Sequence, residues 1–323
     1  MSKQIDARKI WLVAAERTNP NIPASLTGAN AYKTRGIDYK AYDGDKKEKQ
    51  YDGDSGQDVP VKIENAFNSF NFKIDLAPSG TAGEVPFADL FLRVCGMVAS
   101  IDEAAGTVTY APATTPDQIA MLDACVSHLA DDDVDYVIKS ERMRGQLGIT
   151  IKAGEDPEAD VQLQGDYIRP VTAAHAAPVF GLQDTQMAIP ANAQNTPIFK
   201  INNKGICVED FSIKNLSGYT PSRRNMPGGC KYTAMKKGIV EADITFMEPD
   251  WANEFNPYEL AETDDGVKRV PFILQHGTVA GKKFSIECPE VQFIQPEKAE
   301  IDGDVGRKAT IRFLKPLALM WLC

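Results

Sequence analysis

The stretch Phe70-Asn71-Phe72-Lys73-Ile74-Asp75-Leu76 alternates strictly between apolar and polar side chains. A period of two is typical of an antiparallel strand with one face against a core and the other against water. The same alternation recurs in both halves of the chain, at residues 147–152, 161–167, 240–246, 284–288 and 309–313. The sequence therefore predicts a mainly β protein made of antiparallel sheets, and it excludes a parallel α/β fold.

Helical signals are few and short. Three segments have an opening proline and apolar residues at helical spacing: residues 86–94, 115–129 and 256–260. In the second of these, Ile119, Leu122, Val126 and Leu129 would share one face of a helix. We expect these segments to flank the sheets.

The two halves of the chain repeat one order of signals. A segment led by Gly36 or Gly205 runs through a polar loop to a strand that ends near Pro78 or Pro249, and a helical segment and a closing hairpin follow. This order predicts two tandem units, residues 1–172 and 198–323, with an insertion at about residues 98–135 of the first. Residues 173–197 are rich in Ala, Pro, Asn and Gln without periodicity and are predicted to be a linker.

Charge and hydropathy limit the partners. The chain has 45 acidic and 35 basic residues, a formal net charge of −10, so its surface is expected to repel nucleic-acid phosphates. No stretch approaches the run of about 18 apolar residues that a membrane helix requires. The first residues lack the apolar core of a signal peptide, which predicts synthesis in the cytoplasm.

Sequence motifs of metal-binding, phosphate-binding and catalytic sites are incomplete in this chain. The aspartates of residues 42–56 do not match a calcium loop, and residues 277–283 are one residue short of a phosphate-binding loop. The three histidines, His128, His175 and His276, have no acidic or thiol partner at ligand spacing. We therefore expect no enzymatic activity, no cofactor and no metal.

Two regions carry a resemblance to a known family. Residues 277–289 have the sequence GTVAGKKFSIECP, and an acidic turn, Glu300-Ile301-Asp302-Gly303-Asp304, precedes the last strands. Residues 144–148 (RGQLG) and 164–170 (QGDYIRP) add an Arg-Gly strand and a Gly-x-Tyr-x-x-Pro ending. Together they resemble the major tail tube proteins of long-tailed bacteriophages, from about residue 20 onward.

This resemblance implies tail-tube-like units, each a β-sandwich or barrel of two packed antiparallel sheets with a flanking helix. Single-unit members of the family form hexameric rings that stack into a tube, so two units in one chain would give a homotrimeric pseudo-hexameric ring, with a homohexamer as the alternative. The implied partners are further copies of the chain, the tape-measure, tail terminator and baseplate or distal tail proteins, and double-stranded DNA in transit. The implied location is the virion tail, assembled in the host cytoplasm.

Simple geometry agrees with a conduit. Six units with four inner strands each, about 4.8 Å apart and tilted by about 40°, give a barrel of roughly 48 Å and a lumen of roughly 35 Å. A DNA duplex of about 20 Å would pass through such a lumen.

Three groups of residues are candidates for sites in a tube. The polar strand positions expected to line the lumen are Asp75, Glu241, Asp243 and Glu287, although ordinary solvated strand faces would show the same pattern. Contact between rings is assigned to the loop of residues 39–57, with Tyr42, Asp43, Asp45, Tyr51, Asp52 and Asp54. A basic surface complementary to that loop is assigned to Arg223, Arg224 and Lys231.

Other functions remain open at the level of sequence. One alternative is a different self-assembling β protein, such as a secretion-system tube or a virion decoration protein. Another is a carbohydrate-binding β-sandwich module, which would need exposed aromatic residues on one face, whereas Trp11, Trp251 and Trp321 are dispersed.

Overall fold

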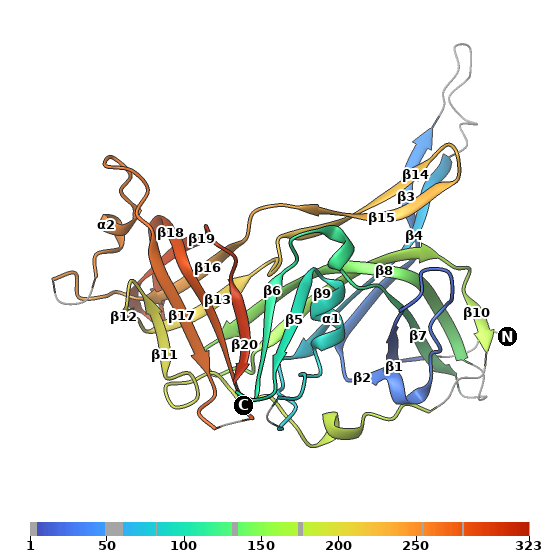
Figure 1. Ribbon diagram of the computed structural model, residues 1–323, viewed down its shortest axis with the longest axis horizontal. Helices are drawn as coiled ribbons and strands as arrows, with labels where there is room; N and C mark the ends of the chain where they lie inside the picture. Colours follow the sequence, from blue (N-terminus) through green and yellow to red (C-terminus); the bar gives the residue numbers. More distant parts are fainter. Residues whose placement is uncertain are drawn as a thin grey trace, which may run out of the picture.

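A computed structural model describes residues 5–48, 61–81, 83–130, 135–173, 177–252, 255–279 and 281–322. Antiparallel strands account for most of these residues, and the α-helices among them are two short ones, α1 (Asp89–Val94) and α2 (Pro257–Ala261). The predicted mainly β fold is confirmed. Figure 1 shows two lobes side by side, one from each half of the chain.

In the described parts of the chain, ten strands come from each half. Those of the first half are β1 (Ile5–Glu16), β2 (Ala31–Tyr32), β3 (Arg35–Glu48), β4 (Val61–Asp75), β5 (Met97–Asp102), β6 (Thr107–Pro112), β7 (Leu122–Ala130), β8 (Asp135–Lys152), β9 (Glu158–Tyr167) and β10 (Val171–Ala173). Those of the second half are β11 (Ile198–Ile201), β12 (Lys204–Gly205), β13 (Val208–Ile213), β14 (Tyr219–Met226), β15 (Cys230–Lys237), β16 (Glu241–Met247), β17 (Val270–His276), β18 (Lys283–Ile301), β19 (Asp304–Phe313) and β20 (Ala318–Leu322). The stretches that alternate in sequence lie within β4, β8, β9, β16, β18 and β19, apart from Leu76, which directly follows β4, and Val240, which directly precedes β16.

The predicted helix over residues 115–129 is wrong. A single 3-10 turn (Pro116–Gln118) is followed by strand β7, which pairs with β1 on one side and with β8 on the other. Leu122, Ala124 and Val126 are fully buried at a spacing of two. The helical spacing seen in the sequence was outweighed because β7 pairs on both edges, with β1 and with β8.

The same set of strand pairings occurs in both halves among the described residues. In the first half, β1 pairs with β2 and β7, β8 pairs with β7, β9 and β10, and β4 pairs with β3 and β9. In the second half, β11 pairs with β12 and β17, β18 pairs with β17, β19 and β20, and β16 pairs with β13 and β19. Each half thus repeats one topology, and α1 and α2 occupy the same place in it.

Two hairpins interrupt this correspondence. The β5–β6 hairpin follows α1 in the first half, and the β14–β15 ribbon lies between β13 and β16 in the second. Of the predicted insertion at residues 98–135, only β5 and β6 lack a counterpart, since β7 corresponds to β17. The segment predicted as a linker packs along the first half through Gln183, whose side chain bonds the backbone of Ala31 and Lys33 at 3.0 Å each.

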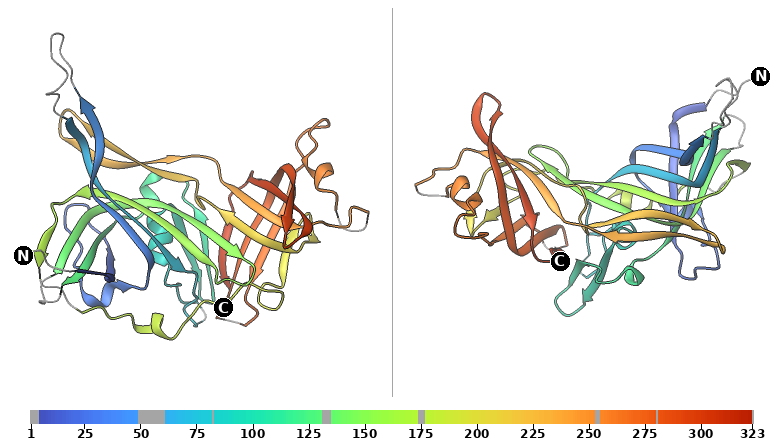
Figure 2. Two further views of the ribbon diagram at one scale, coloured as in Figure 1. Left: turned by 180° about the vertical axis from the view of Figure 1, so that it is seen from behind. Right: turned by 90° about the horizontal axis from the view of Figure 1, so that it is seen from above.

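The halves are joined by backbone pairing into one central sheet. Its strand order is β3-β4-β9-β8-β13-β16-β19-β18. The joint lies between the end of β8 and β13, where Ile149 pairs with Ile213 and Lys152 with Asp210. Figure 2 shows this sheet running through both lobes, with the other strands packed against it.

A continuous core lies behind the joint. Phe211 of β13 is fully buried, stacks on Phe272 at 5.4 Å and meets Phe199 edge to face at 5.4 Å. The hydrophobic cluster that contains these rings extends from Leu12 to Leu319. The two halves therefore share one core across the joint.

Replacing Phe211 with alanine should lower the free energy of unfolding by about 3–5 kcal/mol, because it leaves a cavity behind the joint. Ile239→Ala is the matched control: Ile239 is 63% exposed, and its loss should cost no more than about 0.5 kcal/mol. Denaturant unfolding of the two variants would measure the difference. Equal destabilisation would contradict a core that depends on this ring.

Candidate functional site

The polar face of the central sheet is one continuous surface drawn from both halves. A single row of directly opposed residues runs Asp75, Glu158, Thr150, Ser212 and Asp243 across β4, β9, β8, β13 and β16. Directly paired residues point to the same face of a sheet. Asp75 and Asp243, which come from opposite halves of the chain, therefore lie on one surface.

Of the other predicted lumen residues, Glu241 belongs to this face and Glu287 does not. Glu241 precedes Asp243 by two positions on β16 and pairs with Arg312 of β19. Glu287 lies in the first part of β18, which pairs with β17 and β20 in the other layer. The structure thus brings three of the four predicted residues together.

Cations offset the acidic residues of the polar face. Arg35 contacts Asp75, Lys214 lies 3.1 Å from Asp243, and Arg312 donates two hydrogen bonds to Glu241 at 2.7 and 2.8 Å. A further pair joins Lys73 and Glu158. Such half-exposed pairs contribute little to stability. Their effect is to make the surface polar and mixed in charge.

Both ends of the central sheet are open. Among the described residues, no strand pairs with the edge of β3 opposite β4 or with the edge of residues 292–301 opposite β19. Burial differs accordingly: Phe211 and Ile213 of β13, covered by β8, are fully buried, whereas Ile37 and Tyr39 of β3 are only partly buried. Open edges carry unpaired N–H and C=O groups and are templates for pairing with another chain.

The predicted contact loop lies partly on the hairpin that projects from the molecule in Figure 1. Tyr42, Asp43 and Asp45 belong to β3, and Tyr42 is 52% exposed with its ring edge to face on Tyr167 at 4.8 Å. Tyr51, Asp52 and Asp54 lie outside the described residues.

The predicted basic surface divides into two environments. Arg224 and Lys231 are exposed on the β14–β15 ribbon. The side chain of Arg223 is only 6% exposed and forms an ion pair with Asp166 of β9. Arg223 is therefore an internal contact that fastens the ribbon to the first half, and the exposed basic surface consists of its neighbours.

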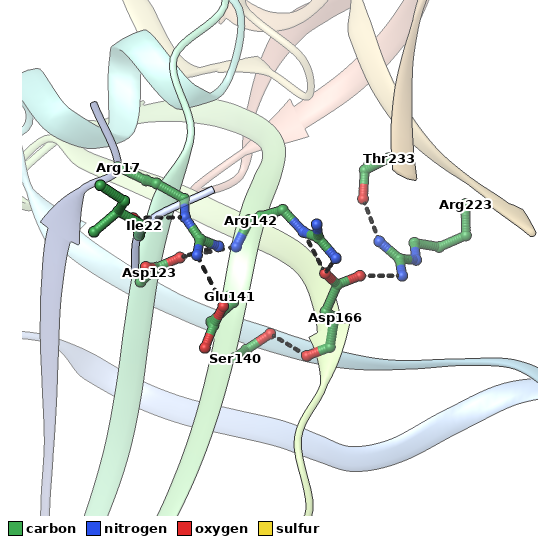
Figure 3. A network of polar contacts seen from close by, with 9 residues as sticks. All are labelled: Arg17, Ile22, Asp123, Ser140, Glu141, Arg142, Asp166, Arg223 and Thr233. Carbon is green, nitrogen blue, oxygen red and sulfur yellow. Dashed lines mark hydrogen bonds and ion pairs between the residues drawn. The ribbon is translucent and has the colours of Figure 1, made fainter. Parts of the chain in front are cut away.

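Figure 3 shows the polar network around this contact, which sequence patterns did not indicate. Asp166 accepts hydrogen bonds from Arg142 and Arg223, and Arg223 also donates to Thr233 at 2.7 Å. Arg142 sits at a β-bulge with a φ of 50°, which turns its side chain toward Asp166. The network joins β8 and β9 to the ribbon.

A second cluster adjoins the first. Arg17 lies 3.3 Å from Asp123 and 3.0 Å from Glu141, and the backbone N–H of Arg142 donates to Asp123 at 2.9 Å. Arg17 and Asp123 are almost completely buried. Removing one member of such a buried pair is costly because its partner keeps an uncompensated charge.

Burial and hydrogen bonding act in opposite directions on Asp166. Burial raises the pKa of its carboxyl group, but hydrogen bonds from Arg223 and Arg142 outweigh burial and hold the pKa below its ordinary value. A carboxyl group with a lowered pKa in the folded state stabilises the fold above its unfolded pKa of about 3.9. This contribution is lost as the pH falls through the folded pKa.

His276 is a titratable residue buried away from the polar face. Burial lowers the pKa of His276 to about 4, and its Nδ1 lies 2.9 Å from the Thr196 hydroxyl. In the part of the chain that the structure describes, no three His, Cys, Asp or Glu side chains are grouped as a metal site requires. Neither described helix has the length and apolar character needed to cross a bilayer.

Asp166→Asn should lower the free energy of unfolding at pH 7 by about 3 kcal/mol, since it leaves Arg223 buried without a counter-charge. The loss should shrink as the pH falls through the lowered pKa of the wild-type carboxyl group, which then also becomes protonated. Asp160→Asn, on the same strand but 42% exposed, should change stability by less than about 1 kcal/mol. Denaturant unfolding across pH 2–7 measures both, and a pH-independent difference for Asp166→Asn would contradict this role.

Comparison of the chain with protein-family models and with curated protein sequences finds no match.

Proposed function

We propose that this chain is a tail-tube-like structural protein, whose copies close into rings and stack into a channel through which phage DNA passes. One observation carries the proposal. The central sheet has two open edges, on β3 and on β18, and these strands occupy the same places in the topology as β13 and β8, which pair with each other at the joint. In the shared topology, β3 corresponds to β13, and β18 corresponds to β8. The β8–β13 pairing within the chain thus provides a template for pairing β18 of one copy with β3 of the next.

Such pairing is head to tail and would generate a ring. An interface that joins two different surfaces closes when its rotation divides a full turn. Closure would pair all the edges of the central sheet and would cover Ile37 and Tyr39, as β8 covers their counterparts on β13.

The strand count supports three copies per ring. Among the described residues, the strand order of the central sheet has eight strands, four from each half. Three copies supply 24 strands, which at a spacing of about 4.8 Å and a tilt of about 40° give a barrel of roughly 48 Å. The lumen of roughly 35 Å that remains inside the side chains admits a duplex.

The polar face suits a channel that does not bind its cargo. A wall rich in unpaired cations would hold DNA through release of counterions. On the polar face of the central sheet, lysines and arginines such as Lys73 and Arg312 are paired with carboxylates. A mixed, self-neutralised wall offers phosphates little net attraction.

The proposal is tested by electron microscopy of purified protein and by one substitution on the open edge. Wild-type protein should form stacked rings, and Ile37→Lys should prevent them, because a lysine on the edge of β3 opposes strand pairing. Val267→Lys is the control, since Val267 is 47% exposed on the loop before β17.

Circular dichroism should show that both variants remain folded. Rings from Ile37→Lys, or monomers from wild-type protein over the whole concentration range, would contradict the proposal.

A further inference from the structure

The β14–β15 ribbon belongs to the second half in sequence but lies on the first half (Figure 1, Figure 2). Its root crosses the joint: the N–H of Leu216 donates to the carbonyl of Leu147 on β8 at 2.8 Å, and the Ser217 hydroxyl donates to the carbonyl of Cys95 at 2.5 Å. Leu216 is 1% exposed at this crossing. The ribbon is therefore a strap over the β8–β13 joint.

The base and the middle of the ribbon are also packed on the first half. Arg223 is bound by Asp166 of β9, and Tyr219 and Met235 are buried against Ala113 and Ile119 of the first half. A ribbon that left the joint free would expose these apolar side chains. Its position is thus part of how the two halves are held together.

The first half has a segment in the same topological place. The ribbon connects β13 to β16, and the outer part of the β3–β4 hairpin, residues 41–48 and 61–68, connects the strands that correspond to them. We call this outer part the arm. In Figure 1 the arm projects away from its own lobe.

The registers of the two halves can be matched at a shared irregularity. The β7–β8 ladder shifts between its Leu122–Met143 and Ala124–Ser140 pairs, and the β17–β18 ladder shifts between Val270–Val291 and Phe272–Cys288. Met143 thus corresponds to Val291. By count along the chain, Leu147 corresponds to Gln295, which lies in the register shift of the β18–β19 ladder between Ile294 and Glu297.

The same correspondence between the halves can be followed from β8 and β18 to the arm through pairs of directly opposed residues on neighbouring strands. On β8, β9 and β4 the ladder runs Gln146–Gln162–Asn71 and reaches Asp38 of β3. On β18, β19 and β16 it runs Ile294–Thr310–Asp243 and reaches Ser212 of β13. Asp38 therefore corresponds to Ser212. By count along the chain, Tyr42 takes the place of Leu216 and lies within the one-residue register shift of the β3–β4 ladder between Lys40 and Asp43.

The two corresponding residues differ sharply in exposure. Leu216 is buried at the joint, whereas Tyr42 is 52% exposed. The strand that would receive Tyr42, by correspondence with Leu147, is β18 at Gln295, which lies at the opposite end of the central sheet of the same chain. A single copy cannot bring these two residues together.

We infer that the arm is a strap between copies: in the assembly it crosses the β18–β3 joint and lies on the second half of the neighbouring copy in the same ring, with Tyr42 against the bulge at Gln295. This inference rests on the proposed ring. It assigns the root of the arm to a contact within a ring, whereas the resemblance to tail tube proteins implies a contact of the loop with the next ring.

Cysteine cross-linking tests the contact. Tyr42→Cys and Gln295→Cys are combined in a background in which the exposed Cys207 and Cys230, and Cys323, are serine. A short bismaleimide should then link successive copies into covalent multimers on a denaturing gel, and either single variant should not. A second pair, Tyr42→Cys with Lys231→Cys, reports a contact with the ribbon of another ring.

The outcomes separate the strap from the ring. Rings seen by microscopy together with links only to Lys231, or with none, would overturn the strap and leave the ring proposal standing. Absence of rings and of all multimers would overturn both.

If the double variant does not fold, hydrogen exchange of the unmodified protein decides the matter. The peptides covering residues 39–45 and 292–298 should both gain protection on assembly. A ring in which neither peptide gains protection would contradict the strap.

Discussion

The fold depends on one constraint: every edge of a sheet presents backbone N–H and C=O groups that must find partners or face water. At the middle of the central sheet this constraint is met by β8 and β13, which join the two halves through antiparallel pairing. The phenylalanines of the shared core lie behind that joint, and the β14–β15 ribbon crosses in front of it. At the two ends of the sheet, β3 and residues 292–301 meet the same constraint only through water or through another copy.

The repeated strand topology of the two halves relates these unpaired edges to assembly. Because both halves have the same pairings, β18 at one end of the sheet corresponds to β8, and β3 at the other end corresponds to β13. The ion pair between Asp166 and Arg223 holds the ribbon against the first half, beside the β8–β13 joint. A second pairing between the halves, of β6 with β20, lies in the other layer. Mixed charge on the polar face follows from the same cross-strand geometry, which places cations opposite carboxylates along neighbouring strands.

Much of the fold could be predicted from alternation alone. The strands around Phe70, Leu147, Ile244 and Ile286 lie where a period of two placed them, because the alternate apolar side chains of each are buried. The segment after Pro116 was misassigned as a helix, since Leu122 and Val126 satisfy a spacing of four as well as of two. Only the neighbouring strands β1 and β8 distinguish these alternatives.

The candidate site was less accessible to sequence. Asp75, Glu241 and Asp243 share a face because alternation fixes the side of each strand, whereas Glu287 lies apart from them because β18 passes from one layer to the other. The ion pair between Asp166 and Arg223 joins residues 57 positions apart, and no local pattern marks it.

The central claim is that the edges of one copy are completed by its sisters around a common axis. The most direct test is the mass of the assembled ring, measured by native mass spectrometry under conditions that keep rings intact. The account predicts three copies in each closed ring, which gives six repeats of the half-chain topology around the channel. A closed two-fold dimer, or a stable monomer at every concentration, would contradict it.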